Sequence, residues 1–160
     1  ASSGRDGENS YIFPANGANT PIEILEGDTP LIVERREFLM DSGGAGKFRG
    51  GLGTRTVFRI PDDEHAPQTP VSLGIQSGRF RLPPEGLAGG QAGSRAKFLI
   101  NGEQGNPYGL TKLHPGDVIV MESSGGGGYG SPNERNRDAL MEDLRAGWVS
   151  EEKANSEYGS

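Results

Sequence analysis

Two arginines separated by one aromatic residue form the segment best suited to bind a charged group. Arg79 and Arg81 flank Phe80, and Pro83-Pro84 follows at once. A guanidinium group presents paired N–H donors that match a carboxylate or a phosphate, and the prolines stiffen the loop. Arginines and aromatic residues are also enriched at the centres of protein interfaces. The segment therefore indicates an anion-binding site or an interface, with equal weight.

A run of glycines lies between a strand-like and a helix-like stretch. The run satisfies the spacing G-x-G-x-x-G, but a dinucleotide site would also need a β-α-β unit and an acidic residue about 20 positions further on. Only two short helical patterns follow the run. Its N–H groups remain candidates for binding an anion, and close packing against another backbone is the favoured alternative. The four candidate residues are Gly125, Gly126, Gly127 and Gly128.

Other motifs exclude several kinds of chemistry. The stretch from Gly43 to Lys47 resembles half of a phosphate-binding loop, but Asp41 and Phe48 occupy positions where that loop needs Gly and Ser or Thr. It is interpreted as a turn that exposes Lys47 and Arg49. There is no Cys and no G-x-S-x-G motif, which argues against a thiol or elbow-type serine nucleophile.

The two histidines do not form a metal-binding pattern. His65 lies in an acidic loop and His114 in a tight turn, and a zinc site needs three or four ligands at characteristic spacings. Both are expected at the surface. We predict no metal site and no cofactor bound by this chain.

Composition limits the partners and the size of the core. The net charge of −6 argues against nucleic acid and anionic membranes, which attract basic surfaces. No apolar stretch is long enough to span a bilayer, and the cytoplasm is the simplest compartment. Glycine accounts for 27 of 160 residues, and only 32% are hydrophobic. A core this thin favours a part of a larger assembly.

Short alternating segments separated by Gly and Pro predict a mainly β fold, a sandwich-like or barrel-like domain. Residues 1–20 read as an extended N-terminal arm, and residues 21–130 as the β-rich domain. The expected strands are Ile22–Leu25, Leu31–Phe38, Thr54–Ile60, Val71–Gln76, Ala96–Ile100 and Asp117–Glu122.

Residues 131–160 predict a C-terminal helical hairpin packed on the β domain. Ser131 and Glu134 form a capping box with Pro132 at the first helical position, so a helix is expected up to about Ala146 and a stop at Gly147. A second helix begins after Ser150. The corner residues Trp148 and Val149 are expected to hold the two helices against the sheet.

Several of these stretches, in this order, resemble the C-terminal region of the hydantoinase B/oxoprolinase family. That family includes hydantoinase B subunits, 5-oxoprolinase, and subunits of acetone and acetophenone carboxylases. The stretches are NTPIEILE at 19–26, DSGGAGKFRGG at 41–51, PPEGLAGG at 83–90, PGDV at 115–118, GGGGYG at 125–130 and the closing segment from Asp143 to Gly159. The chain departs from the family pattern at Ser131, where we expect Asp, and at Glu85, where we expect a bulky residue.

The resemblance implies a division of labour between subunits. An A-type subunit binds ATP and Mg²⁺ and activates the substrate, and the N-terminal portion of the B-type protein carries any divalent metal. This chain would be the C-terminal part of the B-type subunit of an ATP-dependent ring-opening amidohydrolase, which acts on a small molecule. The alternatives are the same part of an ATP-dependent ketone carboxylase and a non-catalytic assembly module.

Candidate binding residues follow from this hypothesis. Arg79, Arg81 and the glycine run would recognise anionic groups, and Asn19 and Thr20 would anchor polar ones. Glu23 would act as a base or make a structural hydrogen bond. No catalytic residue is assigned.

Overall fold

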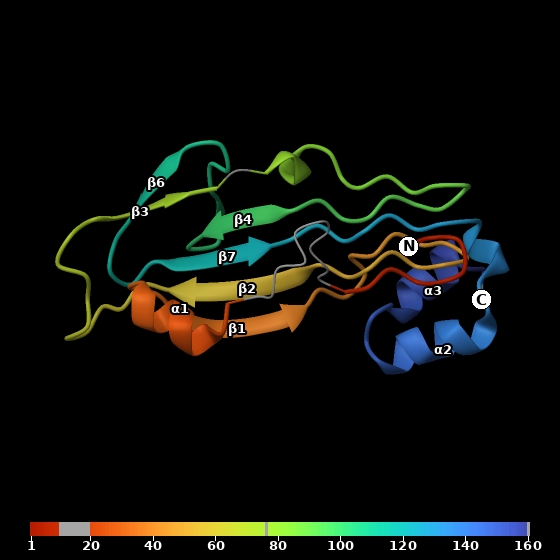
Figure 1. Ribbon diagram of the computed structural model, residues 1–160, viewed down its shortest axis with the longest axis horizontal. Coiled ribbons are helices and arrows are strands. Elements are labelled where there is room, and N and C mark those ends of the chain that lie inside the picture. The colour runs from red at the N-terminus through yellow and green to blue at the C-terminus, as the bar shows by residue number, and fades with distance from the viewer. Residues whose placement is uncertain (10–19, 76, 160) are drawn as a thin grey trace.

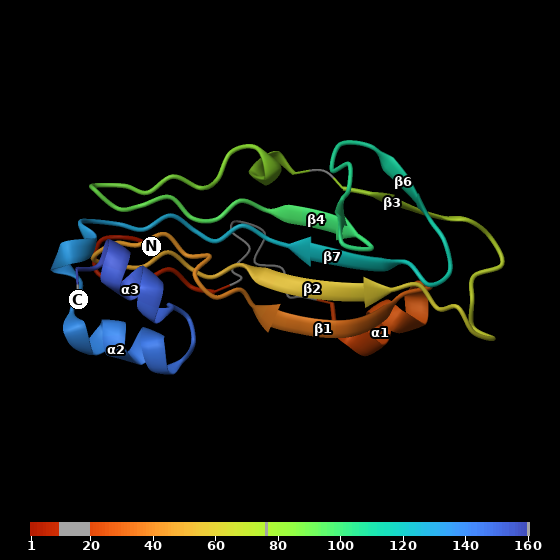
Figure 2. The same ribbon diagram turned by 180° about the vertical axis from the view of Figure 1, so that it is seen from behind.

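The computed structural model describes residues 1–9, 20–75 and 77–159. One half of the molecule is an antiparallel sheet, and the other half consists of extended glycine-rich segments with two helices beside them (Figure 1). The same division is seen from behind in Figure 2. The fold is mainly β, as predicted, but its main sheet does not close into a barrel.

The main sheet has five antiparallel strands in the order β1-β2-β7-β4-β5. Strands β3 and β6 form a second, smaller sheet. The strands are β1 (Ile32–Phe38), β2 (Thr54–Arg59), β3 (Val71–Gly74), β4 (Lys97–Ile100), β5 (Glu103–Gln104), β6 (Leu110–Leu113) and β7 (Val118–Glu122). Five of the six strands expected from the sequence are present, with ends that differ by one or two residues, and β5 and β6 were not expected.

The small sheet covers one face of the main sheet. Phe98 of β4 and Ile119 of β7 point to that face and are buried against Leu113 of β6 and Ile60. Ile100 of β4 and Met121 of β7 pack against the same cluster, because every second side chain along a strand points to the same face. Burial of about four such side chains supplies on the order of 6–12 kcal/mol of transfer free energy.

The strand expected at Ile22–Leu25 is instead the first turn of helix α1 (Ile22–Asp28). Pro21 supplies a helical φ of −53° at the start, and the Thr29 hydroxyl donates to the carbonyl oxygen of Leu25 (2.6 Å) at the end. Glu26 accepts a hydrogen bond from the N–H of Val33 (2.7 Å), which ties the helix to β1. These local bonds outweigh the β propensity of the isoleucines.

The C-terminal hairpin begins later than its capping box predicts. Residues Pro132–Glu134 form only a 3₁₀ turn (η2), without a side-chain cap. Helix α2 (Arg137–Arg145) is capped by Asn136, whose side chain accepts from the N–H of Asp138 (2.7 Å). Gly147 follows with φ +69°, as expected for a helix stop, and Ser150 caps α3 (Glu151–Glu157).

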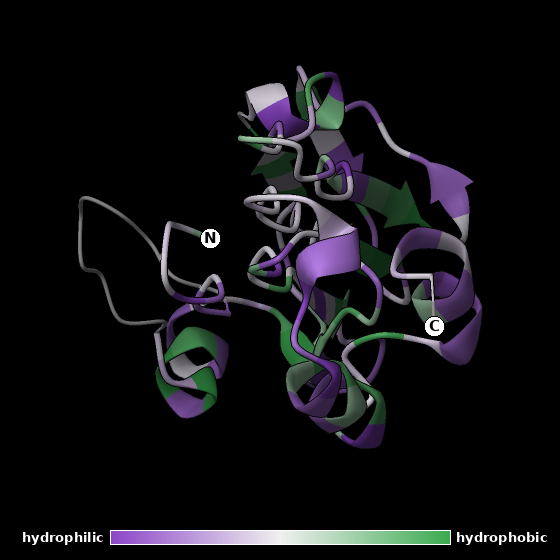
Figure 3. Cartoon of the chain, turned by 90° about the vertical axis from the view of Figure 1, so that its right-hand side faces the viewer, coloured by the Kyte–Doolittle hydropathy of each residue, from purple (hydrophilic) through white to green (hydrophobic). Residues whose placement is uncertain are grey.

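The hairpin packs on the glycine-rich segments rather than on the sheet. Val149 and Leu140 are buried with Ala45, Ala154 and Tyr158 in a second apolar cluster. Viewed from this end, pale and purple loops and helices lie in front of the green strands (Figure 3). The prediction that Trp148 and Val149 hold the helices against the sheet is therefore wrong: Val149 packs in this second cluster, and the Trp148 ring lies 5.0 Å from the guanidinium carbon of Arg49.

Candidate functional site

Four extended segments lie side by side at this end, and we call them the glycine bundle. A methyl group at Gly125 would overlap the carbonyl oxygen of Ser42, and one at Gly127 would overlap that of Glu85. Backbones can approach this closely only where no Cβ stands between them. The bundle comprises residues 5–9, 42–53, 84–94 and 123–130 (Figure 1).

Hydrogen bonds across the bundle occupy most donors of the glycine run. The N–H of Gly125 donates to Ser94 Oγ (3.2 Å), that of Gly126 to Gly51 (2.8 Å) and that of Gly128 to Gln91 (2.9 Å). An anion-binding nest needs N–H groups that are free to point at the ligand. Close backbone packing accounts for these glycines, and their anion-binding role stays a prediction.

A cluster of buried charges fastens the hairpin to the bundle. Asp143 of α2 accepts from Arg49 Nε (3.2 Å) and from Arg135 Nη2 (2.6 Å). Arg135 also makes a paired contact with Asp6, with both distances 2.9 Å. The side chains of Arg49 and Arg135 are each only 2% exposed, so the expectation that Arg49 is exposed is wrong.

The environment of the cluster shifts the ionisation of its members. Burial alone would raise the pKa of Asp6, but the hydrogen bond and charge of Arg135 outweigh burial and hold that pKa below its usual value. Burial raises the pKa of Tyr158 to about 12. Because both guanidinium groups are matched by carboxylates, the cluster acts as a structural clamp.

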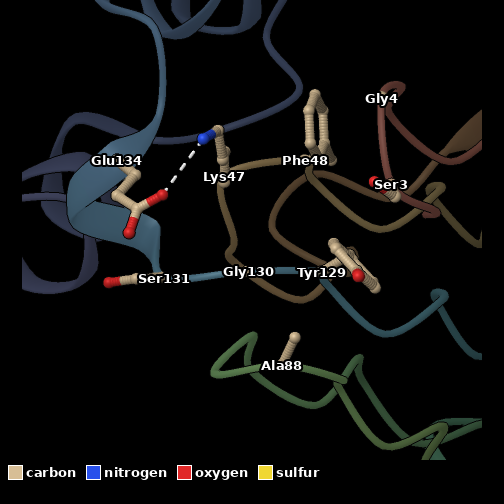
Figure 4. Close-up of a pocket in the computed structure, with 9 residues that line it drawn as sticks. All are labelled: Ser3, Gly4, Lys47, Phe48, Ala88, Tyr129, Gly130, Ser131 and Glu134. Carbon is tan, nitrogen blue, oxygen red and sulfur yellow. Dashed lines mark hydrogen bonds and ion pairs between the residues drawn. The ribbon is translucent and has the colours of Figure 1, made fainter.

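A shallow pocket opens at the tip of the bundle, with a volume of about 430 Å³. Figure 4 shows Lys47 and Glu134 facing one another across its rim, where Lys47 Nζ and Glu134 Oε2 are 3.1 Å apart. The Phe48 and Tyr129 rings lie 6.4 Å apart at one side. The lining residues are Ser3, Gly4, Lys47, Phe48, Ala88, Tyr129, Gly130, Ser131 and Glu134.

This pocket combines a cation, an anion, hydroxyl groups and aromatic surface. The side chains of Lys47 and Glu134 are 47% and 61% exposed, and such exposed pairs contribute only about 0–1 kcal/mol. Each partner can therefore exchange the other for a ligand group at small cost. Sequence reasoning missed this pairing because its two members stand 87 positions apart.

The other candidate residues do not gather at this pocket. Thr20 and Glu23 are exposed beside or on α1, at the opposite end of the molecule (Figure 2), and Asn19 lies outside the described residues. Arg79 belongs to the 3₁₀ turn η1 (Gly78–Phe80), and Arg81 follows it. The structure thus places the candidates in three separate regions, and no single site contains them.

Residues 1–9, 20–75 and 77–159 contain neither a metal-ligand cluster nor a membrane-spanning helix. There, no group of three or more His, Asp or Glu side chains is placed to hold a metal ion. His65 and His114 are exposed, as expected, with side-chain exposures of 75% and 78%. No described helix is long and apolar enough to cross a membrane.

The sheet, the glycine bundle and the helical hairpin define a mainly β domain held together in large part by backbone packing. The chain belongs to the hydantoinase B/oxoprolinase family, whose model matches residues 1–132. The family predicted from the sequence motifs is therefore confirmed.

Three comparisons illustrate the relationship. The caprolactamase subunit beta of Pseudomonas jessenii is 37% identical over 147 residues, which cover 86% of this chain and 24% of that protein. The crystal structure of the ATP-dependent caprolactamase from the same organism superposes with a TM-score of 0.69 at 31% identity, over 87% of this chain and 24% of that one. A nucleotide-free acetone carboxylase gives a TM-score of 0.75 over 99% of this chain and 25% of that one, but at 23% identity this likeness concerns the fold alone. The chain therefore spans about a quarter of the length of these relatives.

Proposed function

We propose that this chain is the C-terminal part of the B-type subunit of an ATP-dependent ring-opening amidohydrolase. Its role is to support the active site and subunit assembly. The observation that carries the proposal is the 37% identity with a caprolactamase subunit, together with the shared fold at 31% identity. The name of this relative favours a cyclic amide such as a lactam as the substrate class.

The described residues support an auxiliary role. They include no metal-ligand group, and the glycine bundle is engaged in its own packing. In this proposal ATP and Mg²⁺ bind to an A-type partner subunit, and any divalent metal binds to the N-terminal portion of the B-type polypeptide. The assembly works in the cytoplasm. The pocket beside Lys47 is the place where this chain contacts a small polar molecule.

The test uses the full-length B-type polypeptide together with its A-type partner. We expect ATP hydrolysis coupled to the opening of a cyclic amide, measured with a lactam, a hydantoin and 5-oxoproline. Bicarbonate-dependent ATP hydrolysis with a ketone, and none with cyclic amides, would refute the proposal and establish the carboxylase alternative. The carboxylase is the second candidate because this fold also occurs in acetone carboxylase.

The role of the pocket is tested separately with Lys47→Met. We expect turnover to fall by roughly 10- to 150-fold, because one charge-assisted hydrogen bond contributes roughly 1.5–3 kcal/mol. Arg36→Met is the control, since Arg36 is an exposed cation on β1, away from the pocket. If neither variant changes turnover while the subunits still assemble, the pocket has no part in the reaction, and the domain is an assembly module.

A further inference from the structure

Three large apolar side chains lie exposed beside the small sheet. Leu82 is 72% exposed, Tyr108 51% and Leu110 81%. Arg81 stacks on the Tyr108 ring, with its guanidinium carbon 4.6 Å from the ring centre. We call Arg81, Leu82, Tyr108 and Leu110 the η1–β6 patch. Large exposed apolar side chains on segments joined by such ring contacts are typical of a binding surface.

The patch is held in place by the core beneath it. Phe80 packs against the main apolar cluster, and its ring meets Tyr108 edge-on, with centres 6.3 Å apart and planes at 79°. The Leu110 side chain lies against Gly74 of the neighbouring strand, where a methyl group would come within 3.1 Å of it. Side chains that are already ordered lose little entropy on binding, which favours a stable interface.

Three cations, Arg79, Arg81 and Lys112, lie on the segments that carry the patch, although the chain has a net charge of −6. Among the described residues, the ion pairs include none formed by Arg79, Arg81 or Lys112. The cations of the main sheet differ, since Arg55 and Arg59 each contact carboxylates. Arg79 and Arg81 therefore have no carboxylate partner among the described residues, and a carboxylate on another segment would complement their charge.

We propose that the η1–β6 patch docks onto the remaining part of the same B-type polypeptide, on a segment where a carboxylate is flanked by apolar side chains. The carboxylate would accept from Arg81 while Leu82 and Leu110 enter apolar surface. The relatives extend to about four times the length of this chain, so most of their polypeptide lies outside the matched region. A surface on the same polypeptide is present at high effective concentration. This inference rests on the proposed function, because it requires the longer B-type polypeptide.

Site-specific cross-linking in the full-length complex tests the docking partner. A photoreactive amino acid replaces Leu110, and, as a control, Met141 on α2, which is 47% exposed. We expect cross-links from position 110 to an acidic and apolar segment of the same polypeptide, and none to that segment from position 141. Cross-links from position 110 to the A-type subunit or to a second copy, or none at all, would overturn the proposal.

A charge reversal gives a second and independent readout. Arg81→Glu and Leu110→Asp should each speed proteolytic cleavage between this domain and the rest of the full-length polypeptide by about tenfold, while Met141→Asp leaves the rate unchanged. Leu110 is 81% exposed, so its replacement does not disturb the core. Unchanged cleavage in both variants would refute docking. The cyclic-amide assay is scored separately, so that docking without lactam opening, or lactam opening without docking, identifies which proposal has failed.

Discussion

Replacement of Gly127 by alanine should destabilise the protein more than the same replacement at Gly126 or at Gly27. The added methyl group would overlap the carbonyl oxygen of Glu85 and would lie 2.5 Å from its carbonyl carbon and 2.9 Å from the nitrogen of Gly86. These are backbone atoms, and the adjacent segments are fixed by the bond from the Leu87 N–H to the Gly128 carbonyl oxygen (2.9 Å). A flexible side chain could move aside, whereas this backbone cannot move without breaking such bonds.

The expected loss is about 3 kcal/mol of unfolding free energy, at the upper end of the usual range for overpacking. For a domain of this size each kcal/mol lowers Tm by roughly 2–4 °C, so the shift should be about 6–12 °C. Urea denaturation, monitored by fluorescence, measures the loss of unfolding free energy, and thermal denaturation measures the shift of Tm. Both should agree in sign and in order of magnitude.

Two other glycines serve as controls. At Gly126 the nearest atom to an added methyl group is the nitrogen of Gly51 at 3.2 Å, so a small local adjustment is enough. At Gly27, in α1, nothing lies within 4 Å, and alanine should stabilise the helix by about 0.5–1 kcal/mol. The reasoning is refuted if Gly127→Ala stays within about 0.5 kcal/mol of the wild type, or if Gly126→Ala is the more damaging change.

Three further predictions concern the cluster of buried charges and its neighbour Tyr158. Asp143→Ala leaves two buried guanidinium groups short of a carboxylate and should lower the unfolding free energy by about 3–5 kcal/mol, whereas the exposed neighbour Glu142→Ala should change it by less than about 0.5 kcal/mol in urea denaturation. The pKa of Asp6 is lower in the folded state, so its stabilisation is present above about pH 4 and is lost as the pH falls through the folded pKa. Asp6→Asn should therefore flatten the acid limb of a stability–pH curve, and an unchanged limb would count against the Asp6 contact. The pKa of Tyr158 is raised to about 12 in the folded state, so stability should fall as the pH rises from about 10 to about 12. Tyr158→Phe should remove that fall. An absorbance titration in which all four tyrosines ionise near pH 10 would contradict the raised pKa.

The strands were predictable where short β-branched or apolar runs are bounded by turn residues. Thr54–Arg59 is rich in β-branched residues, and Val118–Glu122 is a short apolar run that follows a Pro-Gly turn; both signals are visible without a structure. The segment at Ile22 was misassigned because a short run of branched residues fits a strand as well as the first turn of a helix. Its outcome depended on the Pro21 start and on bonds to Thr29 and Val33, and sequence patterns do not show those bonds.

The site was less predictable than the fold. The buried cluster joins Asp6, Arg49, Arg135 and Asp143, which are up to 137 positions apart, and nothing local in the sequence distinguishes Arg49 from an exposed arginine. The same is true of the pocket pair, Lys47 and Glu134. Long-range pairing of charges follows from the path of the glycine bundle, and glycines have no side chains whose pattern could reveal that path.

The close packing of backbones in the bundle limits what the family motifs can reveal. Three of the stretches that made the family recognisable, at 41–51, 83–90 and 125–130, lie in or at the edge of this bundle. Their glycines are required because neighbouring main chains leave no room for a β-carbon. The glycines of these motifs are therefore required by main-chain geometry. They identify the ancestry of the chain but carry no information about the substrate of each enzyme. The substrate must be read from the few side chains at the rim of the bundle and from the rest of the subunit.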